Sequence, residues 1–344
     1  MLTSLTEQLL TGTDLSNEQV VEAVKHITSE EISAEEKANF LTALANKGES
    51  HEELAAFAGE LRDRATKVPL DEATRADEIL DVCGTGGDGL HTFNISTTVA
   101  LVCAAAGITV AKHGNRAITS KSGSADVLEA LGIPTDLSPT DAALALSKHG
   151  FAFLFAPLYH PAFKNIMPAR KLCAEAGQRT LFNFLGPLLN PAQPTAQLIG
   201  VPSAELTEPM AKVLQNLGIR RGMVVSGRVG DKRMDELSTL GENTIAEFYQ
   251  DRGFTTSTLN PFDLPLAKAN LEDLAGGDAA TNAHIIRSIL SSEIKGPKRE
   301  AVLLNAGAAL FVANKANSIS TGMELAAEII DSGQASAKLA ELSA

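Results

Sequence analysis

The stretch ILDVCGTGGDGLHTFNISTTVALVCAAAGITVAKHGNRAITSKSGSAD, residues 79–126, decides the fold of this chain. Residues 79–83 form a short, mostly apolar run, which is typical of a buried strand. Residues 99–106 are apolar and are followed by Gly107, which predicts a helix that ends at glycine, and residues 108–111 predict a second strand. The order strand, glycine-rich loop, helix, strand indicates a parallel β-α-β unit.

The polar clusters of this stretch predict a pocket for a polyphosphate. They are GTGGD (84–88), NIST (94–97), KHGNR (112–116) and GSAD (123–126). Glycines let a ligand approach backbone N–H groups closely, and a helix N-terminus adds unpaired donors. Ser96, Thr97 and Thr98, ahead of the predicted helix, therefore form a natural seat for phosphate. Lys112 and Arg116 would bring positive charge to the same edge of the sheet, where open parallel sheets place their ligands.

The chain before and after this stretch shows two different patterns. Three serines precede Glu or Gln by three positions, the spacing of a capping box, and each begins an apolar 3.6-residue pattern. They are Ser16 with Gln19, Ser33 with Glu36, and Ser50 with Glu53. We therefore expect residues 1–70 to be helical. Beyond residue 124, strand-like runs alternate with helical patterns, which predicts a mainly parallel sheet covered by helices.

The segment 183–191, NFLGPLLNP, interrupts that alternation. It is too rich in Gly and Pro for a regular element, so we expect a loop. Its many apolar residues predict that this loop is packed against the protein. The segment 157–161, PLYHP, is likewise expected to be a loop that leads into a helix.

Composition excludes several classes of protein. The chain has 344 residues, 44% of them apolar, and a formal net charge of −13, which argues against a nucleic-acid or anionic-membrane surface because both need a basic face. Three cysteines without a CxxC pair fit a reducing compartment. Neither a leader-like N-terminus nor an apolar run of about 18 residues is present. We expect a soluble, cytoplasmic protein with no nucleic-acid or membrane partner.

The sequence GTGGDG (84–89) also satisfies GxGxxG, the dinucleotide fingerprint. That fingerprint requires a helix that opens within the glycines and an acidic residue about 20 positions further on. Here residues 90–95 intervene before the helix, and the next strand ends at Lys112 and His113, so a dehydrogenase is not favoured. There is also no HExxH, GxSxG or Walker A motif, which removes support for zinc hydrolysis, serine nucleophiles and ATP hydrolysis.

Two acidic features of the sequence can have either a structural or a functional role. Asp88 suits a hydroxyl or a metal-bound water as its partner, or it stabilises its own turn. Asp235 and Glu236 form an acidic pair in MDELS (234–238). They offer the oxygen ligands that Mg²⁺ prefers near a diphosphate; alternatively, both side chains lie on the surface in solvent. On a regular strand the two side chains would point to opposite faces, so both reach one site only from a loop.

Six motifs, in this order and spacing, resemble the anthranilate phosphoribosyltransferase family of tryptophan biosynthesis. They are GTGGD (84–88), NIST (94–97), KHGNRAITS (112–120), GSAD (123–126), FNFLGPLLNP (182–191) and MDELS (234–238). The resemblance implies a nucleoside-phosphorylase-type fold: a helical domain of residues 1–73, joined by helices around 160–180, and an α/β domain of residues 74–344. It also implies a homodimer, the substrates 5-phosphoribosyl diphosphate (PRPP) and anthranilate, and Mg²⁺, with two ions per subunit.

The resemblance also implies which residues form the site. Those at the PRPP site would be Gly84, Gly87, Asp88, Thr92, Asn94, Ile95, Ser96, Thr97, Lys112, His113, Gly114, Asn115, Arg116, Ala117, Ile118, Thr119, Ser120 and Ser124. Anthranilate would contact Gly84, Asn115 and Arg170, with His113, Tyr159 and Pro161 as wall residues. Ser96, Asp235 and Glu236 would bind magnesium. The resemblance assigns no role to Leu90 and His91, because the family often has different residues at these two positions.

The predicted chemistry needs positioning and charge stabilisation. Diphosphate leaves from C1 of the ribose, so donors aimed at the leaving group supply most of the stabilisation. Arg170 can clamp the anthranilate carboxylate, and an aromatic amine is already a competent nucleophile, so no acid or base is assigned.

Three other functions are weighed against this one. A pyrimidine-nucleoside phosphorylase shares the architecture but would not need Asp235 and Glu236. A family member that binds nucleic acid conflicts with the acidic composition. A subunit with an inactive site conflicts with the presence of every binding motif. The sequence does not indicate whether an amidotransferase partner associates with the chain.

Overall fold

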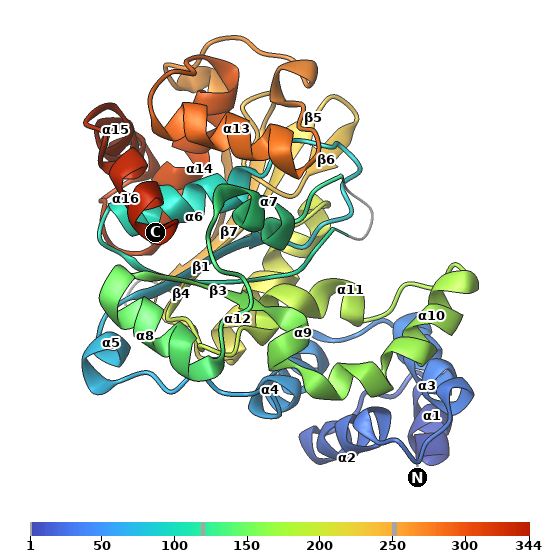
Figure 1. The fold of residues 1–344 in the computed structure, drawn as a ribbon. Coiled ribbons are helices and arrows are strands. Elements are labelled where there is room, and N and C mark those ends of the chain that lie inside the picture. The colour runs from blue at the N-terminus through green and yellow to red at the C-terminus, as the bar shows by residue number, and fades with distance from the viewer. Residues whose placement is uncertain (1, 118–120, 250–252) are drawn as a thin grey trace.

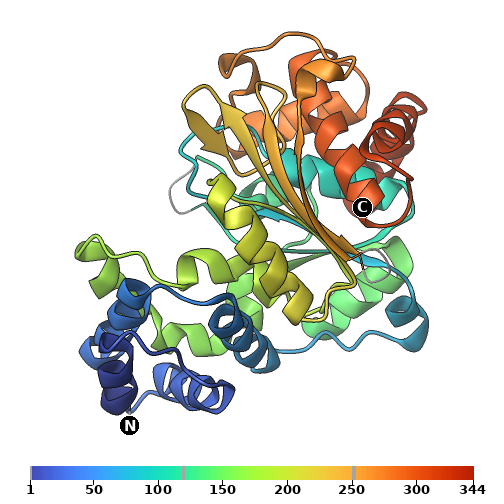
Figure 2. The same cartoon turned by 180° about the vertical axis from the view of Figure 1, so that it is seen from behind.

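The structure is a computed structural model that describes residues 2–117, 121–249 and 253–344. The first four helices and the C-terminal helices lie at opposite ends of the molecule, with a sheet between them (Figure 1, Figure 2). The N-terminal helices are α1 (Leu2–Leu10), α2 (Asn17–Thr28), α3 (Ala34–Lys47), α4 (His51–Asp63) and α5 (Glu72–Ala76). The predicted fold class, a small helical domain and a larger α/β domain, is confirmed.

The predicted start signals form the expected caps in the first helices. Ser16 and Ser50 each make a complete capping box, in which the serine side chain and the side chain three residues later bond each other's backbone N–H. Ser33 accepts from the Glu36 N–H, which satisfies one of the unpaired donors of α3. These helices therefore begin where the local sequence predicts.

One eight-stranded sheet forms the centre of the protein, in the order β3-β2-β1-β4-β5-β7-β8 with β6 paired to β5. The strands are β1 (Ile79–Gly84), β2 (Thr109–Gly114), β3 (Phe151–Phe155), β4 (Ala196–Gly200), β5 (Arg221–Val229), β6 (Lys232–Met234), β7 (Asn243–Tyr249) and β8 (Gly253–Leu259). Strands β1 to β5 pair in parallel, and β6, β7 and β8 pair antiparallel. The strand order reverses between β1 and β4, which is where open α/β sheets bind ligands.

Helices cover both faces of this sheet. They are α6 (Ile95–Ala105), α7 (Ser124–Leu131), α8 (Pro139–His149), α9 (Ala156–Tyr159), α10 (Met167–Glu175), α11 (Phe182–Leu185), α12 (Thr207–Asn216), α13 (Ala279–Leu290), α14 (Pro297–Val312), α15 (Ile319–Asp331) and α16 (Gln334–Leu342). Short 3₁₀ helices are η1 (Pro161–Asn165), η2 (Gly186–Leu189), η3 (Ala204–Leu206), η4 (Pro261–Asp263) and η5 (Glu272–Leu274). None of the helices in the described residues combines the length and apolarity needed to cross a membrane.

Two large apolar cores lie on either side of the sheet. One joins β1, β2, β4 and β5 to α6 and to α13–α16, and the other joins the opposite face to α12 and to the N-terminal helices. Near residue 165 the chain returns to those helices: Lys37 donates from Nζ to the Asn165 carbonyl at 2.8 Å, and α10 packs on α3. The predicted boundary between residues 73 and 74 falls within α5, and the division there stays a prediction.

The structure corrects three local expectations. Helix α6 begins at Ile95, so Ser96 and Thr97 lie in its first turn instead of ahead of it. The segment 182–191 is packed as expected, but it contains α11 and η2, because single helical turns tolerate Gly and Pro at their ends. Residues 156–159 form the helical turn α9 where a loop was predicted.

Candidate functional site

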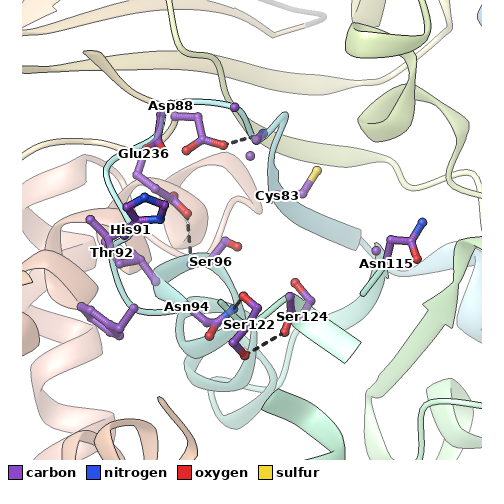
Figure 3. Close-up of a pocket in the computed structure, with 18 of the residues that line it drawn as sticks. Cys83, Asp88, His91, Thr92, Asn94, Ser96, Asn115, Ser122, Ser124 and Glu236 are labelled. Carbon is purple, nitrogen blue, oxygen red and sulfur yellow. Dashed lines mark hydrogen bonds between the residues drawn. The ribbon is translucent and has the colours of Figure 1, made fainter. Parts of the chain in front are cut away.

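A cavity of about 460 Å³ opens where β1 and β2 end, beside the first turn of α6 (Figure 3). Many predicted site residues line it: Gly84, Gly87, Asp88, Thr92, Asn94, Ile95, Ser96, His113, Gly114, Asn115, Ser124, Asp235 and Glu236. It is bounded also by Cys83, Gly86, Gly89, His91, Phe93, Ser122 and Gly123, which were not predicted. All of these are sequence neighbours of the predicted motifs, so a window around each motif would have included them.

The loop after β6 lies directly over the ends of β1 and β4. A Cβ on Gly84 would be 2.1 Å from Asp235 Oδ2, and a Cβ on Gly200 would be 1.6 Å from the Asp235 carbonyl oxygen. Both strands therefore end in glycine because Asp235, through its side chain at Gly84 and its backbone at Gly200, occupies the space of a Cβ. The backbone N–H of Gly86 donates to Asp235 Oδ2 at 2.7 Å and joins this loop to the glycine-rich loop.

Three carboxylates of the cavity lining, those of Asp88, Asp235 and Glu236, repel one another. Burial, followed by repulsion from Asp88, raises the pKa of Asp235. Burial, followed by repulsion from Asp235, raises the pKa of Glu236, although the Lys112 ammonium opposes that shift. A bound cation would offset the repulsion among these carboxylates and lower their pKa values, so that they would carry their negative charges.

The oxygen donors of this cavity fit Mg²⁺. Within the described residues, no group of three or more His, Cys, Asp or Glu side chains is arranged to hold a metal ion. Mg²⁺ does not require such a cage, because it keeps several waters and is bound through one or two carboxylates together with substrate phosphates. Asp235 and Glu236 would provide the carboxylates, and Glu236 Oε1 accepts from the Ser96 N–H at 3.2 Å, which brings the Ser96 side chain close.

Two helix N-termini meet at the cavity. Helix α6 starts after Asn94, whose side chain makes no capping bond, and helix α7 starts at Ser124 after Gly123. Thr97 Oγ1 donates to Ser124 Oγ at 3.2 Å, so the first turns of the two helices touch. The partial positive charge at the N-terminal end of a helix favours an anion, which supports a phosphate seat at this position.

The two basic residues predicted for the cavity have different positions. Lys112 is buried within β2, and its Nζ donates to the Val82 carbonyl at 2.6 Å and to Ser96 Oγ at 3.4 Å. Arg116 lies at the surface, where it pairs with Asp126 and Glu129. The expectation that Arg116 brings charge to the cavity is wrong in this structure, because two acids of α7 hold its guanidinium outward.

A run of rings leads from the cavity to Arg170. His113 Nε2 is 3.2 Å from His160 Nε2, and the ring of His160 is 5.2 Å from that of Phe163. The Phe163 ring is in turn 5.6 Å from that of Phe182, and the Arg170 guanidinium lies 5.3 Å from the centre of Phe182. Burial lowers the pKa of His113 to about 3 and that of His160 to about 4, so both rings are neutral at pH 7.

Three further predicted residues that the structure describes, Tyr159, Pro161 and Ala117, lie outside the cavity lining. Tyr159 is buried in a separate apolar cluster, and its hydroxyl donates to the Leu137 carbonyl at 3.0 Å, so the structure does not bring it to the wall. Pro161 is exposed at the start of η1. The Ala117 N–H donates to Asp126 Oδ2 at 3.0 Å. Ile118, Thr119 and Ser120 lie outside the described residues.

Comparison with known proteins identifies the family of this fold and site. The model of the glycosyl transferase family a/b domain matches residues 76–336, and that of its helical bundle domain matches residues 3–65. The anthranilate phosphoribosyltransferase of Acetivibrio thermocellus is 45% identical over 99% of this chain and 95% of its own length.

Solved structures agree with this result. The crystal structure of anthranilate phosphoribosyltransferase from Thermus thermophilus is 41% identical, with a TM-score of 0.89 over 98% of each chain. The Saccharomyces cerevisiae enzyme has been solved in complex with PRPP and Mg, at 28% identity and a TM-score of 0.85, and in complex with 4-fluoroanthranilate, at 27% and 0.84; each match covers 99% of this chain and 96% of the yeast chain. The chain therefore belongs to the glycosyl transferase family and, within it, to the anthranilate phosphoribosyltransferases.

Proposed function

We propose that the chain transfers the phosphoribosyl group of PRPP to the amine of anthranilate, releasing diphosphate, as a step of tryptophan biosynthesis. The observation that carries the proposal is the cavity itself: two helix N-termini face a cluster of acids at the point where the strand order reverses. An anionic sugar diphosphate with a divalent cation matches both halves of this arrangement. The yeast relatives solved with PRPP and Mg and with 4-fluoroanthranilate support the same substrates here.

The residues of the chain act by binding and orienting the substrates. The glycine-rich loop and the first turns of α6 and α7 would hold the phosphates, while Lys112 orients the Ser96 hydroxyl by donating a hydrogen bond to it. Arg170, at the end of the run of rings, would bind the anthranilate carboxylate and direct its amine toward C1 of the ribose. The C1–O bond breaks with its electron pair leaving on diphosphate, the C1–N bond forms, and the amine releases one proton to solvent.

We propose that Ser96, Asp235 and Glu236 hold Mg²⁺, with two ions per subunit. When bound, the metal neutralises the diphosphate leaving group. The mutual repulsion among Asp88, Asp235 and Glu236 supports this assignment, because it disappears once a divalent cation is present.

The direct test is a transfer assay followed by the loss of anthranilate fluorescence. Product is expected only when anthranilate, PRPP and Mg²⁺ are all present. Glu236→Ala should abolish the magnesium-dependent rate, whereas Glu7→Ala, which removes an exposed carboxylate of α1, should leave it unchanged. Cleavage of thymidine or uridine by inorganic phosphate, with Glu236→Ala fully active, would instead establish a nucleoside phosphorylase.

We also propose that the chain forms a homodimer through its N-terminal helices. Leu10 at the end of α1 is 71% exposed, and Leu172 on α10 is also exposed, so this end of the molecule presents apolar side chains to solvent. Sedimentation velocity should give twice the monomer mass, and Leu10→Asp should shift the protein toward the monomer. A cytoplasmic location stays a prediction.

A further inference from the structure

Asn282 connects the C-terminal part of the chain to the candidate site. It lies in α13, is 2% exposed, and donates from Nδ2 to Asn94 Oδ1 at 2.8 Å. The two residues are 188 positions apart in the sequence. No motif of the sequence indicates this contact, and the side chain of Asn282 does not reach the cavity lining.

The backbone determines which way both amides face. The N–H of Gly277 can only donate, and it donates to Asn282 Oδ1 at 2.7 Å. Asn282 must therefore present its amide nitrogen to Asn94, and Asn94 must present its oxygen to Asn282. The amide nitrogen of Asn94 then donates to the Ser122 carbonyl at 3.2 Å, on the lining of the cavity.

The main chain around Asn282 is tied to the loop ahead of α6. The Phe93 N–H donates to the Leu274 carbonyl at 3.1 Å, the Gly276 N–H donates to the His91 carbonyl at 3.0 Å, and Thr92 forms a bridge with Ala275. A Cβ on Gly276 would be 2.7 Å from Phe93 Cα, so the two segments touch backbone to backbone. The Gly277 N–H and Asn94 are therefore held at a fixed separation, which the amide of Asn282 spans.

We infer that Asn282 is a positioning residue that makes Asn94 present an amide nitrogen, and not an amide oxygen, to the phosphate-binding cavity. The nitrogen carries two hydrogens, and one is used by Ser122. The second would be available to a bound phosphate, which a donor suits and an oxygen would repel. This inference rests on the proposed function, because it assigns the orientation that binding of PRPP requires.

The test replaces Asn282 by aspartate, which keeps the oxygen for Gly277 and places a second oxygen against Asn94. Asn94 should then rotate to donate toward Asp and to turn its oxygen to the cavity. We expect the KM for PRPP to rise about 10-fold to 100-fold, the range for losing a hydrogen bond to a charged group. The KM for anthranilate and kcat should change little, because the lost contact is one of binding. Asn17→Asp, the same change at an exposed position of α2, should alter neither constant.

Two further measurements separate orientation from folding. In an Asn94→Ala background, N282D should have no additional effect on the KM for PRPP, because it acts through Asn94 alone. Inorganic diphosphate should raise the melting temperature of the wild-type chain and of Asn17→Asp, and should raise that of the N282D variant much less.

If N282D folds only poorly, Asn282→Ala serves instead, with a smaller expected rise in the same KM. An additive effect of N282D in the Asn94→Ala background, or an unchanged KM for PRPP in both Asn282 variants, would overturn the inference. Failure of the proposed function would look different, since the wild-type chain itself would then show neither transfer nor stabilisation by diphosphate.

Discussion

Helices α2 and α4 and the cavity at the end of β1 differ in how far along the chain their hydrogen bonds reach. The capping boxes join residues three positions apart, as in Ser16 with Gln19. In the cavity, Gly86 is bonded to Asp235 across 149 positions and Ser96 to Glu236 across 140. The first kind of contact forms as each helix forms, whereas the second exists only after the whole sheet is assembled.

This difference predicts how each region responds to substitution. Loss of a local cap weakens one helix end, and neighbouring turns are unaffected. Loss of a long-range contact displaces a loop that carries site residues, and a displacement of about 1 Å in a site costs about 100-fold in rate. Four substitutions test the comparison.

The largest effect is expected for Gly84→Ala. Its Cβ would collide with Asp235, both with the carboxylate and, at 2.9 Å, with the carbonyl oxygen, so the acidic loop must move. We expect kcat/KM in the transfer assay to fall at least about 100-fold. Gly59→Ala in α4 is the control: its Cβ would be 3.8 Å from Leu217, and it should keep full activity and gain up to about 1 kcal/mol of stability. Equal activity of the two variants would contradict the proposed contrast.

A smaller effect is expected where the acidic loop is held by α14. Asn305 is fully buried, accepts from the Leu237 N–H at 2.8 Å, and donates to the Leu237 carbonyl at 2.9 Å. Asn305→Leu leaves both backbone groups buried and unpaired, so urea denaturation should show a loss of about 2–3 kcal/mol. Asn17→Leu on the surface of α2 should change the unfolding free energy by less than about 0.5 kcal/mol.

Acid should destabilise the His113–His160 contact. The pKa of His160 falls from its ordinary 6.5 to about 4 in the folded chain because the ring is buried. Below pH 6.5 the unfolded chain takes up a proton that the folded chain does not, so this contribution to stability is present above pH 6.5 and is lost as the pH falls. Between pH 7 and pH 5 the wild-type chain should lose about 2 kcal/mol more than His160→Asn, as measured by chemical denaturation. An identical pH dependence in both proteins would argue against a neutral buried ring.

The smallest effect is expected for Ser50→Ala. It removes one capping box of α4 and should lower the unfolding free energy by about 1 kcal/mol. Both KM values and kcat should be unchanged, because no long-range contact is lost. A changed KM would show that this helix is coupled to the site after all.

Much of the fold could be predicted because its signals are local. The starts of α2, α3 and α4 were predicted from the serines that cap them, and β1 and β2 from their apolar runs. The motifs also indicated which segments meet, since strand ends of a parallel sheet share one edge. The start of α6 was missed because Ile95 to Thr98 carry no distinct helix signal, and α11 because Gly and Pro obscured a single turn.

The sequence by itself determined the kind of site: glycine loops, two helix starts and an acidic pair, each encoded within a few residues. Only the tertiary structure decided which charges face it. Lys112 is buried beside the first turn of α6, where its Nζ donates to Ser96 Oγ, while Arg116, four residues later, pairs with acids on α7 at the surface. Asp235 and Glu236 both reach the cavity because β6 folds back on β5 just before them. Side-chain direction depends on pairing register and, for the acidic pair, on partners more than a hundred residues away, which no short window of sequence contains.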